Sequence, residues 1–354
     1  MIGTKPPGLR RAVFLWVGFR CRGSDGSRDR FLGKPRRDFR RSHKIPAPQD
    51  PGKVPLRAFP RPALAHAGEA GDDGGMSALP RSRAAHTTDA LREWIGRYRR
   101  VFVLTGAGCS TRSGIPDYRD AEGSWKRKPP VMYQAFVGDD ATYRRYWARS
   151  HVGWPRFSQA RPNAAHHALA AWQATGSMSL LVTQNVDGLH QRAGHRHVVD
   201  LHGCLDEVVC LDCGLRQSRE TLQQAIAASN VDWHAGPDAT APDGDADIDD
   251  AAVAGFVAPR CDYCEGLLKP DVVFFGENVP RLRYERARDA LQVSDAMLVA
   301  GSSLMVYSGF RFARMAHEAG LPVAVVNRGR TRADGFAALR LEADVGEALQ
   351  AAVA

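Results

Sequence analysis

The chain has 354 residues, of which 44% are hydrophobic, and its formal net charge is +9. This length suits one large domain with an insertion, or two domains, and the apolar fraction allows a sizeable buried core. The charge is unevenly spread, because residues 1–75 hold 16 Lys and Arg against 7 Asp and Glu, whereas residues 76–354 hold 32 of each. We therefore expect no nucleic-acid binding by the neutral body, since that would need clustered basic side chains.

Residues 1–84 form a basic segment that we expect to be disordered. The segment is rich in Arg, Pro and Gly and has neither a helical nor a strand period. Its one apolar run, residues 12–19, is too short to cross a bilayer, and we expect no membrane association. Two interpretations stay open: the segment is a disordered arm or targeting signal, or translation starts at Met76 and the segment is not made.

From residue 85 onward, helical patterns alternate with short apolar strands. Residues 87–99 begin with Thr and Asp and have the pattern of an amphipathic helix. Strands are expected in RVFVLT, SLLVTQ, VVDLHG, KPDVVFFGE, DAMLVAGSS and PVAVVNRG, with helices between them such as NAAHHALAAWQAT and SGFRFARMAHEAG. This alternation is typical of an α/β fold with a Rossmann-like, doubly wound parallel sheet, in which ligands bind at the carboxyl ends of the strands.

Two insertions interrupt the pattern, so the Rossmann-like domain would comprise residues 85–203 and 268–354. Residues 118–162 are aromatic and basic, and we expect a small helical subdomain there. Residues 204–267 contain two CxxC pairs, separated by an acidic, Ala-rich run at residues 237–255 that reads as a solvated loop.

The two CxxC pairs predict a zinc-binding module. Four thiolates can surround one tetrahedral zinc ion, and four protein ligands leave no open position, so the zinc would be structural. The alternative is that the pairs are redox-active or unpaired cysteines. The four residues are Cys210, Cys213, Cys261 and Cys264.

Small and polar residues follow several of the expected strands. Residues 106–110, GAGCS, form a turn whose backbone N–H groups could approach a phosphate. Residues 113–119 form a polar loop with a stiff Ile-Pro step. Asn185, Asp187 and His202 come at later strand ends, where together they could bind an amide and ribose hydroxyls and accept a proton.

The order of these motifs resembles that of the sirtuins. GAGCSTRSGIPDYR, TQNVDGLH, LHG, the paired CxxC, KPDVVFFGE, GSSLMVYS and VNRG occur in the sirtuin order, over about residues 85–350. IPDYRD, RRYWARSHVGWPRF, CLDCG and LKPDVVFFGENV resemble the sirtuin-4-like, class II branch. The resemblance implies an NAD-dependent protein-lysine deacylase that removes acetyl or long or branched acyl groups and gives nicotinamide and O-acyl-ADP-ribose.

The resemblance also implies site residues, with NAD as co-substrate and one structural Zn²⁺. The catalytic residues would be His202, as general base, with Asn185 and Asp187. Residues implied to bind NAD are Gly106, Ala107, Gly108, Ser110, Ile115, Pro116, Asp117, Tyr118, Arg119, Gln184, Asn185, Asp187, Gly301, Ser302, Ser303, Asn327, Arg328 and Val345.

Acyl-lysine proteins would be the partners, and their backbone would pair with the chain by strand addition. The residues implied for this contact are Val273, Phe274, Phe275, Gly276, Glu277 and Tyr307. Tyr146 and Arg149 have a spacing similar to that of sirtuins that bind acidic acyl groups, and on a helix they would share a face. A surface Arg beside a packed Tyr is the alternative.

Three rival functions remain open at this point. A protein mono-ADP-ribosyltransferase would share every NAD-binding residue. A zinc-ribbon nucleic-acid binder conflicts with the neutral body, and a dehydrogenase lacks the expected ribose-binding acid. We expect a monomer in a bacterial cytoplasm, with the mitochondrial matrix as the alternative location.

Overall fold

The structure is a computed structural model that describes residues 87–120, 124, 126, 130–235, 239–240 and 244–353. All of them belong to one unit, Arg61–Ala354. The prediction of a basic disordered or targeting segment at residues 1–84 lies outside the described residues. None of the helices in the described ranges has both the length and the apolar character needed to cross a membrane.

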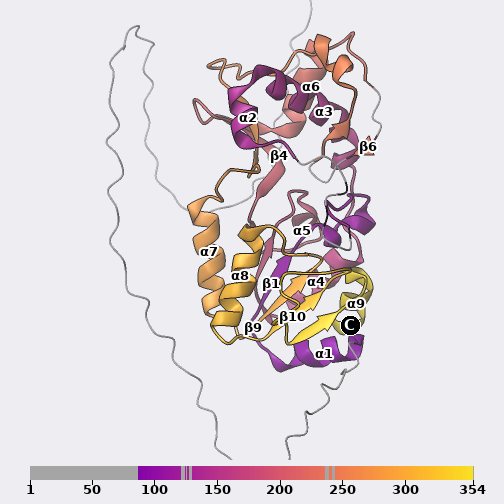
Figure 1. The fold of residues 1–354 in the computed structure, drawn as a ribbon, viewed down its shortest axis with the longest axis vertical. Helices are drawn as coiled ribbons and strands as arrows, with labels where there is room; N and C mark the ends of the chain where they lie inside the picture. The colour runs from indigo at the N-terminus through magenta and orange to yellow at the C-terminus, as the bar shows by residue number, and fades with distance from the viewer. Residues whose placement is uncertain are drawn as a thin grey trace, which may run out of the picture. The chain divides into compact units, whose positions relative to one another are not determined.

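A six-stranded parallel sheet forms the larger part of the fold (Figure 1). The strand order is β11-β10-β9-β1-β2-β3, so the direction of winding reverses between β1 and β9. In such sheets a crevice opens at the carboxyl ends of the strands where the order reverses. The predicted α/β fold is confirmed. The strands are β1 (Val101–Thr105), β2 (Met178–Thr183), β3 (Val198–Asp200), β9 (Ala296–Ala300), β10 (Val323–Val326) and β11 (Leu339–Leu341).

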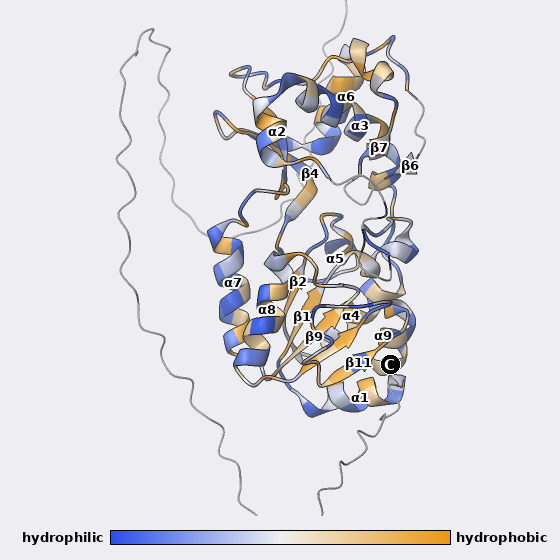
Figure 2. Ribbon diagram, viewed as in Figure 1, coloured by the Kyte–Doolittle hydropathy of each residue, from blue (hydrophilic) through white to orange (hydrophobic). Residues whose placement is uncertain are grey.

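Helices cover both faces of this sheet because its strands are apolar on both sides (Figure 2). Along β1, Val101 and Val103 pack in one core cluster, whereas Phe102 and Leu104 pack in another. This alternation is the two-residue period of a strand buried on both faces. On the first face lie α1 (Thr88–Arg97), α4 (Ala164–Ala174) and α9 (Val345–Val353), and on the second α7 (Arg281–Gln292) and α8 (Tyr307–Glu318).

The N-terminal helix follows its sequence signals. Thr87 is the N-cap of α1, and its side-chain oxygen accepts a hydrogen bond from the backbone N–H of Ala90 at 3.3 Å. Such a cap satisfies one of the donors that a helix start leaves free. Leu91, Trp94 and Ile95 are the buried residues of the helix, and their three- and four-residue spacing places them on one face. The helix predicted at residues 87–99 is therefore present.

A second group of elements surrounds a three-stranded antiparallel sheet of order β5-β4-β8. Its strands are β4 (Gly203–Cys210), β5 (Arg216–Ser218) and β8 (Leu268–Val272). Three helices share a core with this sheet: α2 (Tyr133–Gly138), α3 (Asp140–Ser158) and α6 (Arg219–Ser229). The shorter elements are α5 (Leu189–Arg192), the hairpin β6 (Ala239–Thr240) with β7 (Ala246–Asp247), and the 3₁₀ turns η1 (Ala107–Cys109), η2 (Thr111–Ser113) and η3 (Asp250–Gly255).

Two expectations need correction here. KPDVVFFGE was expected as a strand of the parallel sheet, but β8 ends at Val272 and pairs antiparallel with β4. Periodicity alone cannot tell which sheet a short apolar run joins. The acidic run was expected as a solvated loop, but Ile248 and Val253 are buried in the core with α3 and α6. These two apolar side chains anchor the segment against the helices.

Candidate functional site

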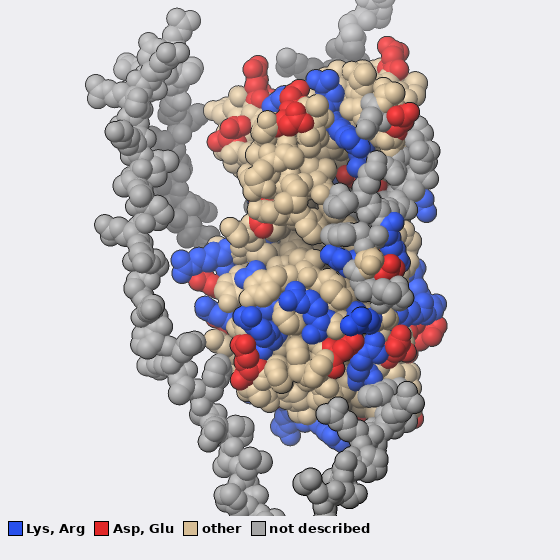
Figure 3. Space-filling view, viewed as in Figure 1, with Lys and Arg blue, Asp and Glu red and all other residues tan. Residues whose placement is uncertain are grey.

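A cavity of about 860 Å³ lies at the strand ends where the sheet order reverses. Its volume is within the usual range for a small-molecule or cofactor site. The face of the molecule drawn in Figure 3 is hollowed and largely uncharged at mid-height, and Lys and Arg side chains gather below the hollow. All non-metal site residues from the sequence except Arg149 line it: Gly106, Ala107, Gly108, Ser110, Ile115, Pro116, Asp117, Tyr118, Arg119, Tyr146, Gln184, Asn185, Asp187, His202, Val273, Phe274, Phe275, Gly276, Glu277, Gly301, Ser302, Ser303, Tyr307, Asn327, Arg328 and Val345.

The turn after β1 packs closely against the turn after β9. Gly108 donates its backbone N–H to the carbonyl oxygen of Gly301 at 2.9 Å. A Cβ atom at Gly106 would lie 2.8 Å from the Cβ of Ser302, which is closer than real side chains approach. Small residues are therefore required at this crossing. The same smallness lets a ligand with phosphates approach the backbone closely.

Ser110 links the first turn to the loop after β2. Its Oγ donates a hydrogen bond to Asp187 Oδ2 at 2.7 Å and accepts one from Asn185 Nδ2 at 3.0 Å. Asn185 Nδ2 also donates to the carbonyl oxygen of Gly106 at 3.1 Å. Asp187 is buried, and burial raises the pKa of its carboxyl group. The network fixes the Asn and Asp side chains at the cavity wall.

His202 follows β3 and is held at both ring nitrogens. Its Nδ1 lies 2.8 Å from the carbonyl oxygen of Gln184, and its Nε2 lies 2.7 Å from Ser308 Oγ. Burial lowers the pKa of His202 to about 4, and the positive charge of Arg311 acts in the same direction. The imidazole is therefore neutral at pH 7, as a general base must be.

A buried group of three histidines lies behind the first turn. The rings of His166 and His190 have centroids 4.8 Å apart, and His195 meets His190 edge-on at 5.2 Å. His190 Nε2 and Thr105 Oγ1 are 2.9 Å apart, and His166 Nδ1 accepts the backbone N–H of Asn163. Cys109 lies near His166 and His190, but each of these two rings already has a polar partner on at least one nitrogen, and we assign no metal to the group.

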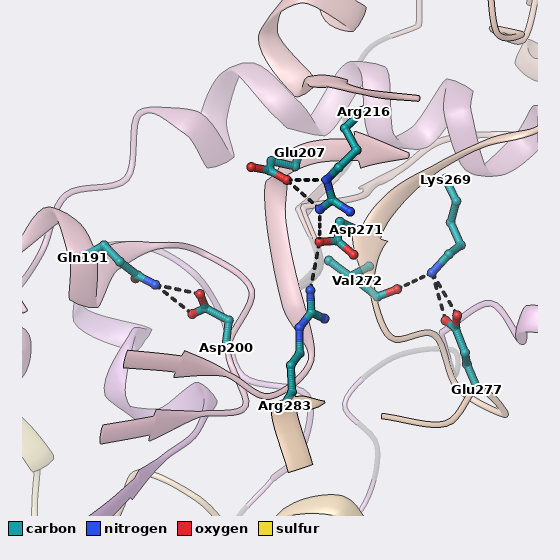
Figure 4. Close-up of polar contacts among 9 residues, drawn as sticks. All are labelled: Gln191, Asp200, Glu207, Arg216, Lys269, Asp271, Val272, Glu277 and Arg283. Atoms are coloured by element: carbon teal, nitrogen blue, oxygen red, sulfur yellow. Dashed lines mark hydrogen bonds and ion pairs between the residues drawn. The ribbon is translucent and has the colours of Figure 1, made fainter. Parts of the chain in front are cut away.

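The loop after β8 forms the opposite wall of the cavity and is fixed by an ion pair (Figure 4). Lys269 is almost fully buried, and its Nζ contacts Glu277 Oε2 at 2.9 Å and the carbonyl oxygen of Val272 at 2.6 Å. Glu277 Oε2 also accepts the backbone N–H of Phe274 at 2.9 Å. The predicted strand-addition residues therefore lie in a loop that this pair shapes.

Tyr146 and Arg149 do not act together in this structure. Tyr146 lines the cavity and packs against Phe274, with ring centroids 5.2 Å apart. Arg149 does not line the cavity; its Nε donates to the carbonyl oxygen of Ala246, in β7, at 2.8 Å. The arginine thus holds the hairpin segment, which disfavours a role in binding an acidic acyl group.

The later strand ends supply the remaining predicted cofactor residues. Asn327 is buried, and its Nδ2 donates to the carbonyl oxygen of Arg328 at 2.7 Å. The Arg328 guanidinium is largely exposed and lies 3.4 Å from the carboxylate of Asp344. Val345 begins α9 beside Asp344. These residues follow β10 and β11, which lie on the same side of β1 in the strand order as β9, the strand before Gly301.

The four CxxC cysteines converge on one point. Their sulfur atoms all lie within 4.8 Å of one another, with Cys210 to Cys264 at 3.5 Å and Cys213 to Cys261 at 3.8 Å. A tetrahedral zinc with Zn–S bonds of about 2.3 Å sets its sulfurs about 3.8 Å apart. The set therefore fits one structural zinc ion, as predicted, and the sulfurs are too far apart for disulfides.

Sequence reasoning missed two cavity residues on α8. Ser308 contacts His202, and Arg311 lines the cavity with its guanidinium over the ring of Tyr284 at 4.7 Å. Both lie in SGFRFARMAHEAG, which was predicted to be a helix, and Ser308 also ends the GSSLMVYS motif, but neither was predicted as a site residue. The signal was the position of this helix, which begins directly after GSSLMV, the segment that follows β9.

The sequence matches the Sir2 family model over residues 106–308. The chain belongs to the Sir2 family. An NAD-dependent protein deacetylase of Xanthomonas campestris pv. campestris is 59% identical over 263 residues, which cover 74% of this chain and 90% of the relative. NAD-dependent protein deacetylase 2 of Bradyrhizobium diazoefficiens is 56% identical over 261 residues, which cover 74% of this chain and 96% of the relative.

Solved Sir2 structures have the same fold. A Sir2–p53 peptide–NAD⁺ complex has a TM-score of 0.60 and 30% identity, covering 75% of this chain and 96% of that one. A Sir2Tm structure bound to a propionylated peptide has the same TM-score and identity, covering 74% and 95%. The family named by the sequence motifs is confirmed, while the sirtuin-4-like branch stays a prediction.

Proposed function

We infer that this chain is an NAD-dependent protein deacetylase that removes acyl groups from lysine side chains of proteins. The observation that carries the inference is a neutral, doubly held His202 in the same cavity as the glycine turns after β1 and β9. One end of this cavity has small residues that let phosphates approach the backbone, and the other end has an apolar wall. The two bacterial relatives that are named NAD-dependent protein deacetylases align with this chain over 90% and 96% of their own length.

We propose that the glycine turns and their neighbours bind NAD. Gly106 and Gly108 would allow the pyrophosphate to approach the backbone, and Ser302 and Asn327 would contact the adenosine half. Asn185 and Asp187, held by Ser110, would orient the ribose and the nicotinamide amide. Residues 113–119 would close over that end. Bound NAD would supply the electrophilic ribose carbon that the acyl carbonyl oxygen attacks and the ribose hydroxyl that takes the acyl group.

The acylated peptide would lie along the loop from Val273 to Glu277, with Tyr307 on its other side. The substrate's own carbonyl oxygen attacks the ribose as nicotinamide leaves, so no protein nucleophile is needed. His202 then accepts a proton from a ribose hydroxyl, which prepares that hydroxyl to take the acyl group. One water molecule is consumed as the amide C–N bond breaks, and the products are the free lysine, nicotinamide and O-acyl-ADP-ribose.

We propose that the acyl group is neutral and that bulky or branched chains are accepted. Ile115, Tyr146 and Phe274 give the cavity an apolar wall, and Arg149 is engaged elsewhere. The assignment to the sirtuin-4-like branch, the domain boundaries at residues 203/204 and 267/268, a monomeric state and a bacterial cytoplasmic location are also proposals. Matches to bacterial proteins support the last of these.

The rival protein mono-ADP-ribosyltransferase would use the same NAD site, so product mass separates the two. Purified protein is incubated with NAD and acetyl-, propionyl-, lipoyl-, biotinyl- and succinyl-lysine peptides, and the products are weighed by mass spectrometry. Deacylated peptide together with O-acyl-ADP-ribose supports the proposal, and the fastest peptide identifies the acyl class. Protein that gains ADP-ribose while every acyl group stays in place would replace it with the transferase.

A further inference from the structure

We propose that Ser308 relays the proton that His202 receives during deacylation. Ser308 Oγ lies 2.7 Å from His202 Nε2, and both residues line the cavity. The proposal rests on the function proposed above, because it assumes that His202 is the general base. It adds a second residue to the proton path, contributed by α8 rather than by the strand ends.

The hydrogen bonds of His202 determine which ring nitrogen is basic. Nδ1 faces the carbonyl oxygen of Gln184, which can only accept, so Nδ1 carries the proton in the neutral ring. Nε2 then has a free lone pair and no proton, and at 2.7 Å it accepts the hydroxyl proton of Ser308. The single acceptor position of the base is therefore occupied by Ser308 before substrate binds.

The start of α8 is built to hold this contact. Gly309 lies against the side chain of Gln184, and a Cβ atom there would come within 2.3 Å of Gln184 Oε1. The Gln184 amide is itself held by Ser302 Oγ at 2.8 Å. The helix start, Gln184 and His202 are thus mutually fixed, which leaves the imidazole little freedom to turn away from Ser308.

A fixed ring with an occupied lone pair favours transfer through the serine. A ribose hydroxyl donates its proton to Ser308 Oγ while the Ser308 proton passes to Nε2. One substrate O–H bond and one serine O–H bond break, one serine O–H bond and one Nε2–H bond form, and the serine ends with one proton. His202 becomes an imidazolium and the ribose oxygen becomes the nucleophile, with no further reactant.

The alternative is that Ser308 blocks the base and must be displaced. The two roles predict opposite results for Ser308→Ala. A relay residue, once removed, slows deacylation, and we expect a loss of about 100-fold in kcat, at the lower end of general acid–base contributions. A blocking residue, once removed, frees Nε2 and leaves kcat unchanged or higher.

The experiment measures two rates in each variant: peptide deacylation and the exchange of labelled nicotinamide into NAD. Exchange reports the step in which nicotinamide leaves, before His202 accepts a proton. We expect Ser308→Ala to slow deacylation and spare exchange, and Ser308→Thr, which keeps the hydroxyl, to restore deacylation. Glu318→Ala, at the exposed end of the same helix, is the matched control and should leave both rates unchanged.

A double-mutant cycle with His202→Ala completes the test. If Ser308 acts through His202, the double variant is no slower than His202→Ala alone. Additive losses, a loss of exchange as well as deacylation, or unimpaired deacylation in Ser308→Ala would each overturn the relay. If His202→Ala itself deacylates at a normal rate, the proposed function fails, whereas a slow His202→Ala beside a fast Ser308→Ala removes only the relay.

Discussion

Val273 donates its backbone N–H to the carbonyl oxygen of His202 at 2.7 Å. The candidate base and the candidate peptide wall are therefore joined by one backbone hydrogen bond, although 70 residues of sequence separate them. A shift of either segment moves the other. The segment with the four cysteines lies between these two residues in the sequence. Its fold must bring the chain back to this hydrogen bond, so the segment helps to position the site.

Gly203, the next residue after the base, should tolerate no side chain. Its φ is +89°, and a Cβ atom would lie 1.8 Å from the carbonyl oxygen of Asp271. We expect Gly203→Ala to destabilise the fold by about 2 kcal/mol or more and to lower deacylation, because relief of the clash displaces His202. Thermal unfolding and the deacylation rate measure the two effects.

Gly96→Ala is the matched control. Gly96 lies in the last turn of α1, and a Cβ atom there would meet nothing within 4 Å. Because Ala has a higher helix propensity than Gly, this variant should be more stable by up to about 0.5–1 kcal/mol, with unchanged activity. Equal stability of the two alanine variants would contradict the steric account of Gly203.

The pH profile of deacylation should lack the fall in activity below about pH 6.5 that a histidine base with an ordinary pKa would give. Burial lowers the pKa of His202 to about 4, so the imidazole is already neutral at pH 6. We expect kcat/KM for deacylation to be flat between pH 6 and 8. A profile that halves near pH 6.5 would mean that the base is not held in this environment, or that another histidine serves.

The Lys269–Glu277 ion pair should control peptide binding more than NAD binding. In Lys269→Met, Glu277 loses its cation and the loop from Val273 to Glu277 loses its anchor. We expect KM for acylated peptide to rise about tenfold while KM for NAD stays constant. Steady-state kinetics with each substrate varied in turn would measure both.

Two variants test whether charge is the cause. Glu277→Gln added to Lys269→Met removes the unpaired charge and should recover part of the stability. Arg281→Ala breaks the exposed pair with Glu285 on α7 and should change neither constant, because exposed pairs contribute little. If KM for NAD rose with KM for peptide, the pair would support the whole cavity rather than its peptide wall.

The cysteine cluster should hold one zinc ion per chain. We expect Cys261→Ser to lose the metal and to destabilise the antiparallel sheet, because Cys261 is buried at the start of the second knuckle. Cys204→Ala is the control, since Cys204 lies outside the cluster. Atomic absorption gives the metal content, and retention of a full equivalent of zinc by Cys261→Ser would exclude this site.

The sequence predicted those site residues that directly follow an expected strand. Gly106, Asn185 and His202 each follow an apolar run, and parallel strands bring such ends together whatever the details of packing. The cluster of four cysteines could be predicted equally well, because it requires only that the two CxxC pairs come together in space. Local patterns suffice for both.

What the sequence could not supply depends on tertiary packing. A spacing of three residues puts Tyr146 and Arg149 on neighbouring positions of α3, yet the tyrosine faces the cavity and the arginine reaches Ala246. The periodicity of a sequence does not show which side of a helix packs against which neighbouring element. Ser308 was missed for the same reason, since its role appears only when the start of α8 is placed against His202.

The buried histidines should make the fold acid-sensitive. Burial lowers the pKa of His195 to about 4 and that of His166 to about 3. The unfolded chain, with histidine pKa values near 6.5, therefore binds more protons than the folded chain between these limits. Stability is fully present above pH 6.5 and is lost as the pH falls toward 4, by up to about 1.4 kcal/mol per pH unit for each such group.

Removal of one of these buried histidines should weaken the dependence of folding stability on pH. We expect His195→Leu to lose less stability than the parent between pH 7 and pH 5, by about 2 kcal/mol, because one proton-binding group is absent from its unfolded state. Urea unfolding at pH 7, 6 and 5 measures this. His234→Leu removes an exposed histidine and serves as the control, with the parent's slope. Parallel slopes for parent and His195→Leu would show that His195 titrates alike in both states and that burial does not hold it neutral.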